Sequence, residues 1–529
     1  MAERYQVVIV GGGPVGVGLA VELGQRGIST ALVERHLEPQ RIPKGQGLTS
    51  RTLEHFYYWG CTEELRAARL LPRGYPIASL TAYGNLMGEY WFVAQQPIGR
   101  GGGHSFYFQA NERLPQYLTE RVLRNRLTEI PSVTTMFGRF AKSFQYGENG
   151  VLVTVANEGW PYEEKTLEAD YLVGCDGARS LVRETVGIDR IGDDYDQRMV
   201  LAVFRSRELH EGLKRFPECT TYRVLKPELQ GYWQFLGRVD VGESWFFHAP
   251  VPRDTRPDNY DFLGLIRQAA GFKTNAEFDH VGFWDLRIQV ASRYREGRVF
   301  IAGDACHNHP PYGGFGLNAG LEDIANLGWK LAAVLQGWGG GRLLDSYTEE
   351  RQPIFVETGK AMIADWINKD RDFLNRYSPE RNRAEFEEAW KGAAKLASSQ
   401  SSEPYYEGSS VIFGPEGGKC TIHGEHMLAA RAGHHLTPQV LSSGRNVFEE
   451  LSRWFTLLAF GADETEISAF EQAASALSVP LKVIRDSFEE GRQAYESRLV
   501  LVRPDQYIAW CGSDAPPDVA DVMRKVVGM

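Results

Sequence analysis

The chain has 529 residues, a formal net charge of −10 and a globular composition, with 43% hydrophobic and 24% charged residues. A chain of this length is too long to fold around a single hydrophobic core of ordinary size, and it predicts about three domains. The acidic balance argues against nucleic acid as a partner, and no 18-residue apolar run predicts a membrane span, so we expect a cytoplasmic protein. The six cysteines form no CxxC pair, which predicts reduced thiols and no metal site.

The first predicted element is a buried strand that runs through a glycine-rich turn into a helix. Gly11 permits the turn, Gly13 lets the backbone approach a pyrophosphate, and Gly16 lets the helix pack closely on the strand. A second strand ends at Glu34, whose carboxylate can accept hydrogen bonds from an adenosine ribose. These residues predict an ADP-binding βαβ unit without distinguishing FAD from NAD.

The middle of the chain predicts a different architecture. A strand delivers Asp176, and residues 188–286 then alternate apolar and polar positions with many aromatic side chains. This pattern is typical of a sheet with one face covered. We interpret it as a substrate-binding domain, to which residues 75–110 contribute, and expect the glycine-rich tract at 99–105 to lie near the substrate.

A third strand ends at Asp304 and is followed by a glycine-rich turn and a helix. Asp304 can accept hydrogen bonds from ribityl hydroxyls, and the backbone N–H groups of the turn can stabilise negative charge on a reduced flavin. This second half-site favours FAD over NAD. Helical patterns continue to about residue 396, a polar break follows at 398–404, and strands and helices resume from about 411.

Residues 297–331 resemble the GD fingerprint of the para-hydroxybenzoate hydroxylase-like flavin monooxygenases, the class A flavoprotein monooxygenases. Residues 169–183 match their DG fingerprint, DGxxSxxR, and residues 43–54 resemble their PRAxGLxxRTLE stretch. The segment 498–510 resembles the end of the thioredoxin-like domain of phenol hydroxylases and polyketide aromatic hydroxylases.

The resemblance implies an α/β and α+β fold. A Rossmann-like FAD-binding domain, residues 1–187 and 287–397, is interleaved with a mixed-sheet substrate domain, residues 188–286. A thioredoxin-like domain without CxxC follows at 409–529. The motifs and the resemblance together predict cofactor contacts from Gly11, Gly13, Pro14, Val15, Gly16, Glu34, Arg35, Lys44, Gln46, Arg51, Gln116, Asp176, Asp304, Pro311, Gly314, Gly316, Leu317 and Asn318.

Two positions depart from the family pattern. Lys44 replaces the usual arginine and keeps its charge without the planar fork. Gln46 stands where phenol hydroxylase-like members carry an acid that assists deprotonation of the substrate. The chain therefore needs another polarising group, and the candidates are the Pro310 carbonyl, His248 and Tyr232.

By resemblance the activity is FAD-dependent hydroxylation of a small phenolic aromatic, with NADPH or NADH as reductant. One atom of O2 is inserted through a flavin C4a-hydroperoxide, and the protein is expected to be a homodimer. The alternatives are another flavoenzyme of this fold, such as an oxidase or a halogenase, although the WxWxIP motif of halogenases is absent. A flavin-binding protein without turnover and, less well supported, an NAD-dependent dehydrogenase are further alternatives.

Overall fold

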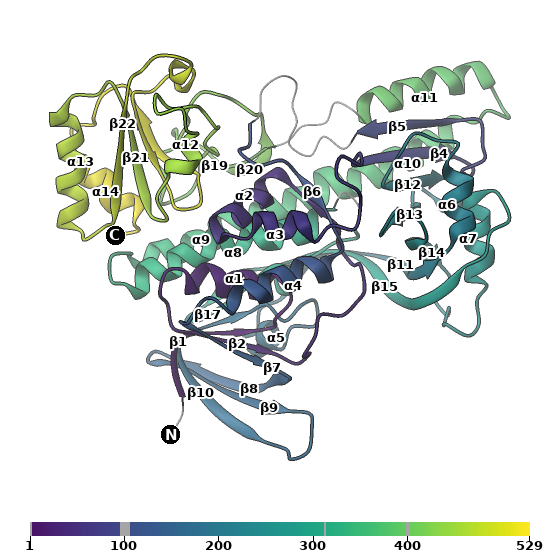
Figure 1. Cartoon of the computed structure of the whole chain (residues 1–529), viewed down its shortest axis with the longest axis horizontal. Helices are drawn as coiled ribbons and strands as arrows, with labels where there is room; N and C mark the ends of the chain where they lie inside the picture. Colours follow the sequence, from purple (N-terminus) through teal and green to yellow (C-terminus); the bar gives the residue numbers. More distant parts are fainter. Residues whose placement is uncertain (1–2, 96–105, 312–313, 398–402) are drawn as a thin grey trace.

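The computed structural model describes residues 3–95, 106–311, 314–397 and 403–529, arranged as three packed units (Figure 1). Each unit is built on its own main sheet. The tract predicted at 99–105 to lie near the substrate falls outside the described residues.

The first unit has a central sheet with the strand order β16-β17-β10-β1-β2-β7, in which β17 to β7 are parallel and the edge strand β16 is antiparallel to β17. The antiparallel strands β9 and β8 extend β10. The apolar run at the end of β1 is fully buried, as expected for a central parallel strand. The strands are β1 (Glu3–Val10), β2 (Thr30–Glu34), β7 (Val133–Phe137), β8 (Arg139–Gly147), β9 (Gly150–Asn157), β10 (Glu164–Gly174), β16 (Arg295–Glu296) and β17 (Val299–Ile301).

Most helices from distant parts of the sequence gather on the side of this sheet that is opposite β8 and β9 (Figure 1). The apolar side chains of α1 and α8 form one buried cluster with β1, β2, β10 and β17. A short ribbon, β3 (Gly47–Leu48) with β6 (Glu112–Arg113), lies beside them. The helices are α1 (Pro14–Gly24), α2 (Ser50–Trp59), α3 (Thr62–Ala67), α4 (Gln116–Leu127), α5 (Leu181–Thr185), α8 (Phe315–Leu335) and α9 (Gly341–Glu357), and the short 3-10 turn η2 covers Gly303–Ala305.

The second unit is a mixed sheet with the order β18-β15-β11-β14-β13-β12-β4-β5. The outer strands β4 and β5 lie within residues 75–110, which were expected to contribute to the substrate domain, and β15 continues past the predicted boundary at residue 286. The strands are β4 (Ala78–Tyr83), β5 (Trp91–Gln95), β11 (Arg190–Arg205), β12 (Thr221–Leu225), β13 (Gln234–Arg238), β14 (Ser244–Val251), β15 (Glu277–Ala291) and β18 (His307–Asn308).

The two faces of this sheet have different neighbours. One face packs under α6 (Arg207–Leu213) and α7 (Phe262–Ala270). The opposite face carries an apolar cluster that includes Ile42 from the first unit. At one end, a π-helical segment η4 (Thr358–Ala364), α10 (Asp365–Arg376) and α11 (Arg383–Ala397) complete the packing.

The C-terminal unit has the sheet order β22-β21-β23-β24, in which β22 is parallel to β21 and the other pairs are antiparallel. This is the thioredoxin-like topology expected from the sequence. Its elements are β19 (Glu403–Tyr406), β20 (Cys420–Gly424), α12 (Val447–Glu450), β21 (Phe455–Phe460), α13 (Glu464–Ala476), β22 (Leu481–Asp486), β23 (Leu499–Val502), β24 (Ile508–Gly512) and α14 (Val519–Val526).

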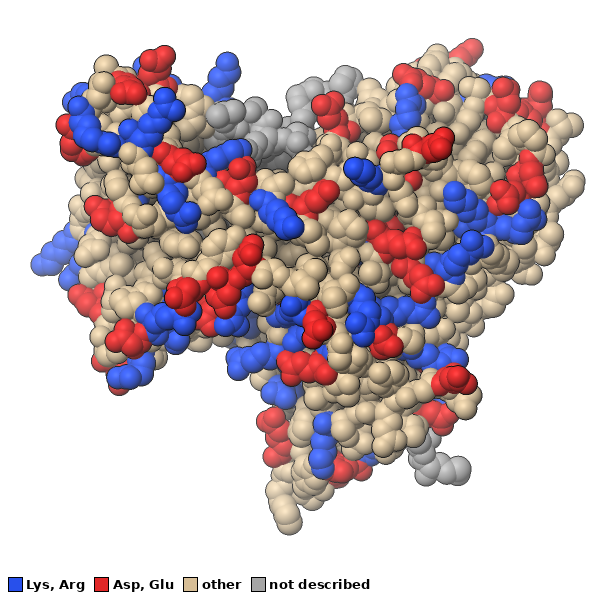
Figure 2. Space-filling view, turned by 180° about the vertical axis from the view of Figure 1, so that it is seen from behind, with Lys and Arg blue, Asp and Glu red and all other residues tan. Residues whose placement is uncertain are grey.

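An apolar interface joins the C-terminal unit to α8 and α9, where Trp329 and Trp338 pack in one cluster with Phe455. Seen from behind, basic and acidic side chains are intermingled over the surface (Figure 2). Within the described residues, no helix is long and apolar enough to cross a bilayer.

Candidate cofactor and active site

Four neighbouring strands bring predicted cofactor residues to one edge of the first sheet. In the order β17-β10-β1-β2, these strands lead to Asp304, Asp176, Gly11 and Glu34 respectively. Because the strands are parallel, their carboxyl ends meet at the same edge. Backbone hydrogen bonds of 2.7 to 2.9 Å between successive strand ends fasten the loops to each other.

The turn after β1 leaves space for a phosphate. Gly11 has φ of +102°, and a Cβ there would lie 2.3 Å from the Cys175 carbonyl oxygen. A Cβ on Gly16 would lie 1.9 Å from the Gly11 carbonyl oxygen. A Cβ on Gly13, by contrast, would meet nothing within 4 Å, and no side chain caps the helix that begins there. Free N–H groups beside open space at a helix N-terminus suit an anion.

A groove of about 210 Å³ continues from this turn along the end of β2. Glu34, Lys44 and Gln116 are among its lining residues. The carboxylate of Glu34 accepts hydrogen bonds from Gly12 N at 2.6 Å and His36 N at 2.7 Å, so the backbone fixes its orientation. The groove can therefore enclose the adenosine part of a dinucleotide, and the Glu34 carboxylate is placed to accept hydrogen bonds from its ribose.

Two groove residues on α4 were missed in the sequence. Arg124 pairs with Glu120 at 2.7 Å, one helical turn apart. Burial raises the pKa of Glu120 to about 7, although Arg124 acts in the opposite direction. The signal was their spacing on the helix that starts at Gln116, but the sequence did not show which face of that helix meets β2.

The two strand-end aspartates present carboxylates toward the same edge. Asp176 Oδ2 accepts from Val182 N at 3.0 Å, whereas its Oδ1 is buried without a partner among the described residues. Burial raises the pKa of Asp176. Asp304 remains solvent-accessible, yet desolvation by the surrounding protein also raises its pKa. A Cβ on Gly303 would lie 3.0 Å from the side chain of Val15, which follows Pro14 at the start of α1.

The DG and GD loops are tied together by Arg183. Its Nη1 donates to the carbonyls of Ala178 at 3.2 Å and Ala305 at 3.3 Å. Ser180 caps α5 by accepting from Arg183 N at 2.9 Å. In this structure these two residues of the DG pattern therefore hold the loops in place.

The start of α8 faces the ribbon that contains Gly47. Gly314 caps the helix in the left-handed conformation, with φ of 72°, and no side chain bonds to its first N–H groups. Asn318 donates from Nδ2 to the carbonyls of Gly314 at 2.7 Å and Gly47 at 2.9 Å, and its Oδ1 accepts from the N-cap residue of α2 at 2.9 Å. A Cβ on Gly45 would lie 3.5 Å from Leu317. The Asn318 side chain thus joins the loops, and free N–H groups remain at the helix start.

Three other predicted cofactor residues differ in their surroundings. Lys44 Nζ lies 3.5 Å from Gln40 Oε1 near the groove. Gln46 is buried, and its Nε2 has no partner among the described residues. The Arg35 guanidinium lies 5.9 Å from the Phe140 ring on β8.

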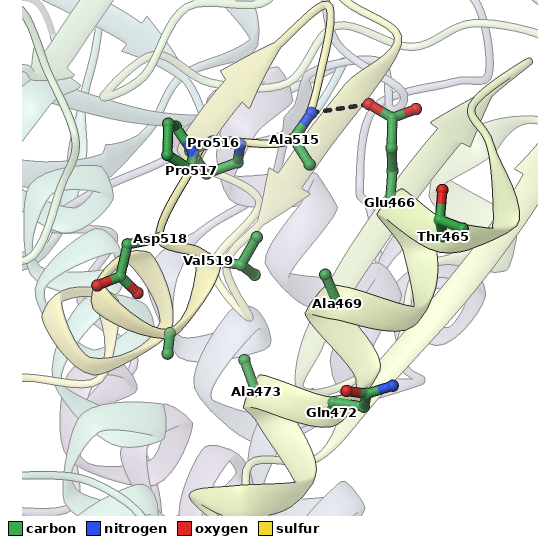
Figure 3. Close-up of a pocket in the computed structure, with 11 residues that line it drawn as sticks. Thr465, Glu466, Ala469, Gln472, Ala473, Ala515, Pro516, Pro517, Asp518 and Val519 are labelled. Atoms are coloured by element: carbon green, nitrogen blue, oxygen red, sulfur yellow. Dashed lines mark hydrogen bonds between the residues drawn. The ribbon is translucent and has the colours of Figure 1, made fainter.

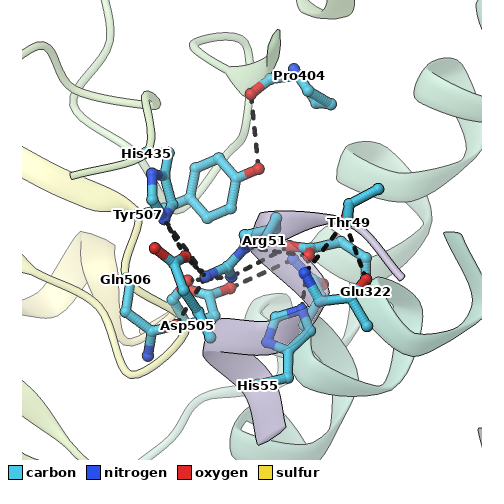
Figure 4. A network of polar contacts seen from close by, with 12 residues as sticks. Thr49, Arg51, His55, Glu322, Pro404, His435, Asp505, Gln506 and Tyr507 are labelled. Atoms are coloured by element: carbon cyan, nitrogen blue, oxygen red, sulfur yellow. Dashed lines mark hydrogen bonds and ion pairs between the residues drawn. The ribbon is translucent and has the colours of Figure 1, made fainter. Parts of the chain in front are cut away.

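Arg51 lies in a polar junction with the C-terminal unit (Figure 4). Its Nε bonds Glu322 at 3.1 Å, its Nη1 bonds Gln506 at 2.8 Å and Glu54 at 3.2 Å, and its Nη2 bonds the Asp505 carbonyl at 2.7 Å and Glu322 at 3.3 Å. All five N–H donors therefore have protein acceptors. The guanidinium joins α2, α8 and the loop after β23 and leaves no donor for a cofactor.

The candidate polarising groups lie on different parts of the second unit. The indole N–H of Trp284 donates to His248 Nδ1 at 3.3 Å, and burial lowers the pKa of His248 to about 4. Tyr232 is partly buried, its ring centroid lies 6.0 Å from the guanidinium carbon of Arg371, and burial raises the pKa of Tyr232. The structure does not join these two side chains into one site, and both stay neutral at pH 7.

The Pro310 carbonyl already has a donor. His309 Nδ1–H bonds this oxygen at 2.5 Å, and burial lowers the pKa of His309 to about 4. The other nitrogen, Nε2, is buried without a partner among the described residues and lies 3.6 Å from where a Cβ on Gly316 would be. Pro311 follows directly before the undescribed residues 312–313.

A buried ion-pair network behind the GD loop was not foreseen. Asp323 accepts from His307 Nε2 at 2.7 Å, from Arg351 Nε at 2.9 Å and from Gly303 N at 3.1 Å. Burial would raise the pKa of Asp323, but His307 and Arg351 outweigh it and lower that pKa. The network fixes the loop that carries Asp304. His307 and Asp323 lie within the family fingerprint at 297–331, whereas Arg351 lies outside it and gave no signal in the sequence.

A larger hollow lies elsewhere. A surface groove of about 510 Å³ separates α13 from the segment 515–520 in the C-terminal unit (Figure 3). Small side chains such as Ala469 and Ala473 line it, and Glu466 accepts from Ala515 N at 2.8 Å on its rim. It contains none of the predicted cofactor residues.

The residues at the sheet edge fit FAD. The open cradle at Gly13, the unpartnered oxygen of Asp176 and the free N–H groups at the start of α8 suit phosphate, hydroxyl and flavin carbonyl groups respectively. In the described part of the chain, no group of three or more histidine, cysteine or acidic residues has the geometry of a metal site.

Comparison with known proteins gives two domain matches. The FAD binding domain profile matches residues 4–358, and the profile of the C-terminal domain of aromatic-ring hydroxylases matches residues 429–529. A putative polyketide hydroxylase of Streptomyces halstedii is 32% identical, covering 97% of this chain and 94% of its own length.

Further relatives have the same extent. The 12-dehydrotetracycline 5-monooxygenase/anhydrotetracycline 6-monooxygenase of Streptomyces rimosus is 32% identical over 96% of this chain and 95% of its own. Among solved structures, aklavinone-11 hydroxylase in a ternary complex with FAD and aklavinone superposes with a TM-score of 0.81, at 25% identity and full coverage of both chains. The fold expected from the sequence is therefore confirmed.

Proposed function

Because the chain belongs to the FAD-binding family of aromatic-ring monooxygenases, we propose that it hydroxylates a phenolic substrate with fused rings. FAD dependence and aromatic hydroxylation follow from membership of the family. The fused-ring substrate is the finer part of the proposal, and the polyketide and tetracycline relatives support it.

The observation that carries this proposal is the aromatic face of the second sheet. Phe235, Phe246 and Trp284 form one apolar cluster with Ile42, which lies in the loop after β2. Lys44, two residues further along that loop, lines the cofactor groove. A flat aromatic ligand on this face would therefore lie against the edge at which we place the flavin, shielded from water by the sheet.

When bound, FAD supplies the electron transfer and oxygen activation that no side chain of the chain can provide. The chain binds and orients it through Asp176, Asp304 and the free N–H groups at the starts of α1 and α8. Because the Nδ1 lone pair of His248 already accepts from Trp284 and its pKa is about 4, His248 positions neighbouring groups and does not remove a proton at neutral pH.

The test is a screen of naphthols and larger fused-ring phenols with the purified yellow protein. We expect one of them to stimulate oxidation of NADPH or NADH, with a hydroxylated product formed in proportion. Stoichiometric hydrogen peroxide without product would indicate an oxidase. Nicotinamide oxidation that responds to none of the phenols would indicate a flavin-binding protein without turnover, and either result contradicts the proposal.

We further propose O2 as the co-substrate and a homodimer as the assembly, both implied by the family resemblance. Turnover under ¹⁸O2 is expected to place one labelled atom in the product. Light scattering of the purified protein is expected to give twice the chain mass of 59.4 kDa. An unlabelled product refutes the first point, and a monomeric mass refutes the second.

A further inference from the structure

Arg113, on β6, is a buried cation without a carboxylate partner among the described residues. It is 5% exposed, and burial lowers its pKa to about 10. Its Nη2 donates to the Arg238 carbonyl at 3.2 Å, while its Nε is buried and has no acceptor among the described residues. An uncompensated buried charge is costly, which makes this position unusual.

The other buried arginines show how the chain satisfies such a group. Arg351 bonds the carboxylate of Asp323 at 2.9 Å, and Arg503 bonds that of Glu350 at 2.7 Å. Arg238 has no carboxylate partner but reaches three acceptors, at 2.8 to 3.1 Å. Arg113 has neither arrangement.

The backbone pairing shows which side of the ribbon Arg113 occupies. Arg113 is paired with Gly47 in the antiparallel ribbon of β3 and β6. Side chains of directly paired residues lie on the same face of the ribbon. On that face a Cβ on Gly47 would meet nothing within 4 Å, so there is open space beside the stem of Arg113.

This space lies between the cofactor unit and the second sheet. The Nη2 bond to Arg238 reaches the end of β13, and Val239 next to it belongs to the apolar cluster that contains Ile42 and Phe246. On the other side, Gln116, three residues after Arg113, lines the cofactor groove.

We propose that Arg113 is a specificity-determining residue that binds a carboxylate carried by the aromatic substrate, at the junction of β3, β6 and β13. The inference rests on the proposed function and names a substrate class for the same site. The unpartnered Nε–H and a neighbouring N–H group of the planar guanidinium can donate to both oxygens of a carboxylate, and low local polarity strengthens such a charge-assisted pair.

The anionic oxygen that Arg113 binds can come from the substrate carboxylate or from the flavin, and the experiment distinguishes these two sources. The test uses holoenzymes of the wild type, Arg113→Met and Arg113→Lys. Arg121→Met serves as a matched control because Arg121 is an exposed arginine on the adjacent α4. The probes are 6-hydroxy-2-naphthoate and its neutral analogue 6-hydroxy-2-naphthamide, and binding is followed by the flavin absorbance change and by equilibrium dialysis.

We expect wild type to bind the naphthoate more tightly than the naphthamide. Arg113→Met is expected to weaken naphthoate binding at least about tenfold and naphthamide binding less than about threefold. Arg113→Lys should give an intermediate loss, and the control none. FAD affinity should stay within about threefold of wild type, and the melting temperature of Arg113→Met should be equal or higher because an unpaired buried charge is removed.

Four results would overturn the inference. Equal weakening of both probes, or a wild type that does not prefer the naphthoate, excludes carboxylate recognition. A loss of FAD affinity without loss of naphthoate preference assigns the anion to the flavin, and a lower melting temperature with unchanged preference assigns Arg113 a structural role. None of these readouts needs turnover, so failure of the hydroxylase proposal in the phenol screen is seen separately.

Discussion

Replacing Gly13 with alanine should separate cofactor binding from folding. Its φ of −68° is accessible to alanine, and the new Cβ would meet no protein atom within 4 Å. The change reduces the freedom of the unfolded chain and weakens the helix N-cap, two effects of about 0.5 to 1 kcal/mol with opposite sign. We therefore expect the stability of the apoprotein to change by less than about 0.5 kcal/mol.

The same methyl group would occupy the space that we assign to the pyrophosphate. Forcing the phosphate away from the N–H groups of α1 should cost at least about 1.4 kcal/mol, which raises the dissociation constant of FAD tenfold or more. Gly16→Ala offers a contrast, because its Cβ would lie 1.9 Å from a backbone oxygen and should destabilise the fold itself. Gly392→Ala, at an exposed position in α11 with open space, is the control, because it should leave FAD affinity unchanged and raise stability by about 0.5 to 1 kcal/mol.

The assay is a fluorescence titration of the deflavinated proteins with FAD, together with thermal unfolding of the same samples. If Gly13→Ala bound FAD with wild-type affinity, the phosphate could not pass over this turn and the assignment of the groove would be wrong. If it unfolded many degrees earlier than wild type, the space beside Gly13 would be filled by protein in solution.

Three further predictions concern buried titratable groups. Asp323→Asn removes the carboxylate paired with Arg351, which should cost about 3 kcal/mol and lower the melting temperature; an unchanged value would contradict this. Burial would raise the pKa of Glu350, but Arg503 outweighs it and holds that pKa well below its usual range. The stability that this ion pair contributes is complete above the unfolded pKa of about 4.3 and is lost as the pH falls below that value. The melting temperature should therefore decline below about pH 4.5, and it should decline less steeply in Glu350→Gln. Equal slopes in the two proteins would refute this. Because burial lowers the pKa of His248 to about 4, His248→Asn should leave the shape of the pH profile of kcat/KM unchanged between pH 5.5 and 8, and a lost inflection would show that His248 titrates there.

The cofactor edge of the fold could be predicted because its signals are local. Gly11, Asp176 and Asp304 each follow a short apolar strand, and parallel strands necessarily bring such positions to one edge. The family resemblance supplied the order of the units. The joining of β4 and β5 to the second sheet could not be read with the same certainty, because strand neighbours there are set by packing between distant segments.

The side-chain partners were not readable in the same way. Arg51 stands in a family motif beside the flavin, yet its acceptor Gln506 is 455 positions away in the sequence. Arg113 gave no signal at all, because a single arginine before a helix is ordinary, and its significance comes from a guanidinium that bonds no carboxylate among the described residues. Long-range electrostatic pairing is the part of the site that needs the fold.

The Arg51 junction has a consequence for protein engineering. A chimera that takes its C-terminal unit from a relative must carry over matching partners at Asp505 and Gln506, or it will strand a guanidinium whose side chain is only 11% exposed. Thr49 and Thr52, in the first turn of α2, donate to Asn318, whose amide in turn donates to the carbonyls of Gly47 and Gly314. We therefore expect exchange of the C-terminal unit to change flavin retention, and a crossover point between residues 398 and 402 needs matched partners for Arg51 at positions 505 and 506.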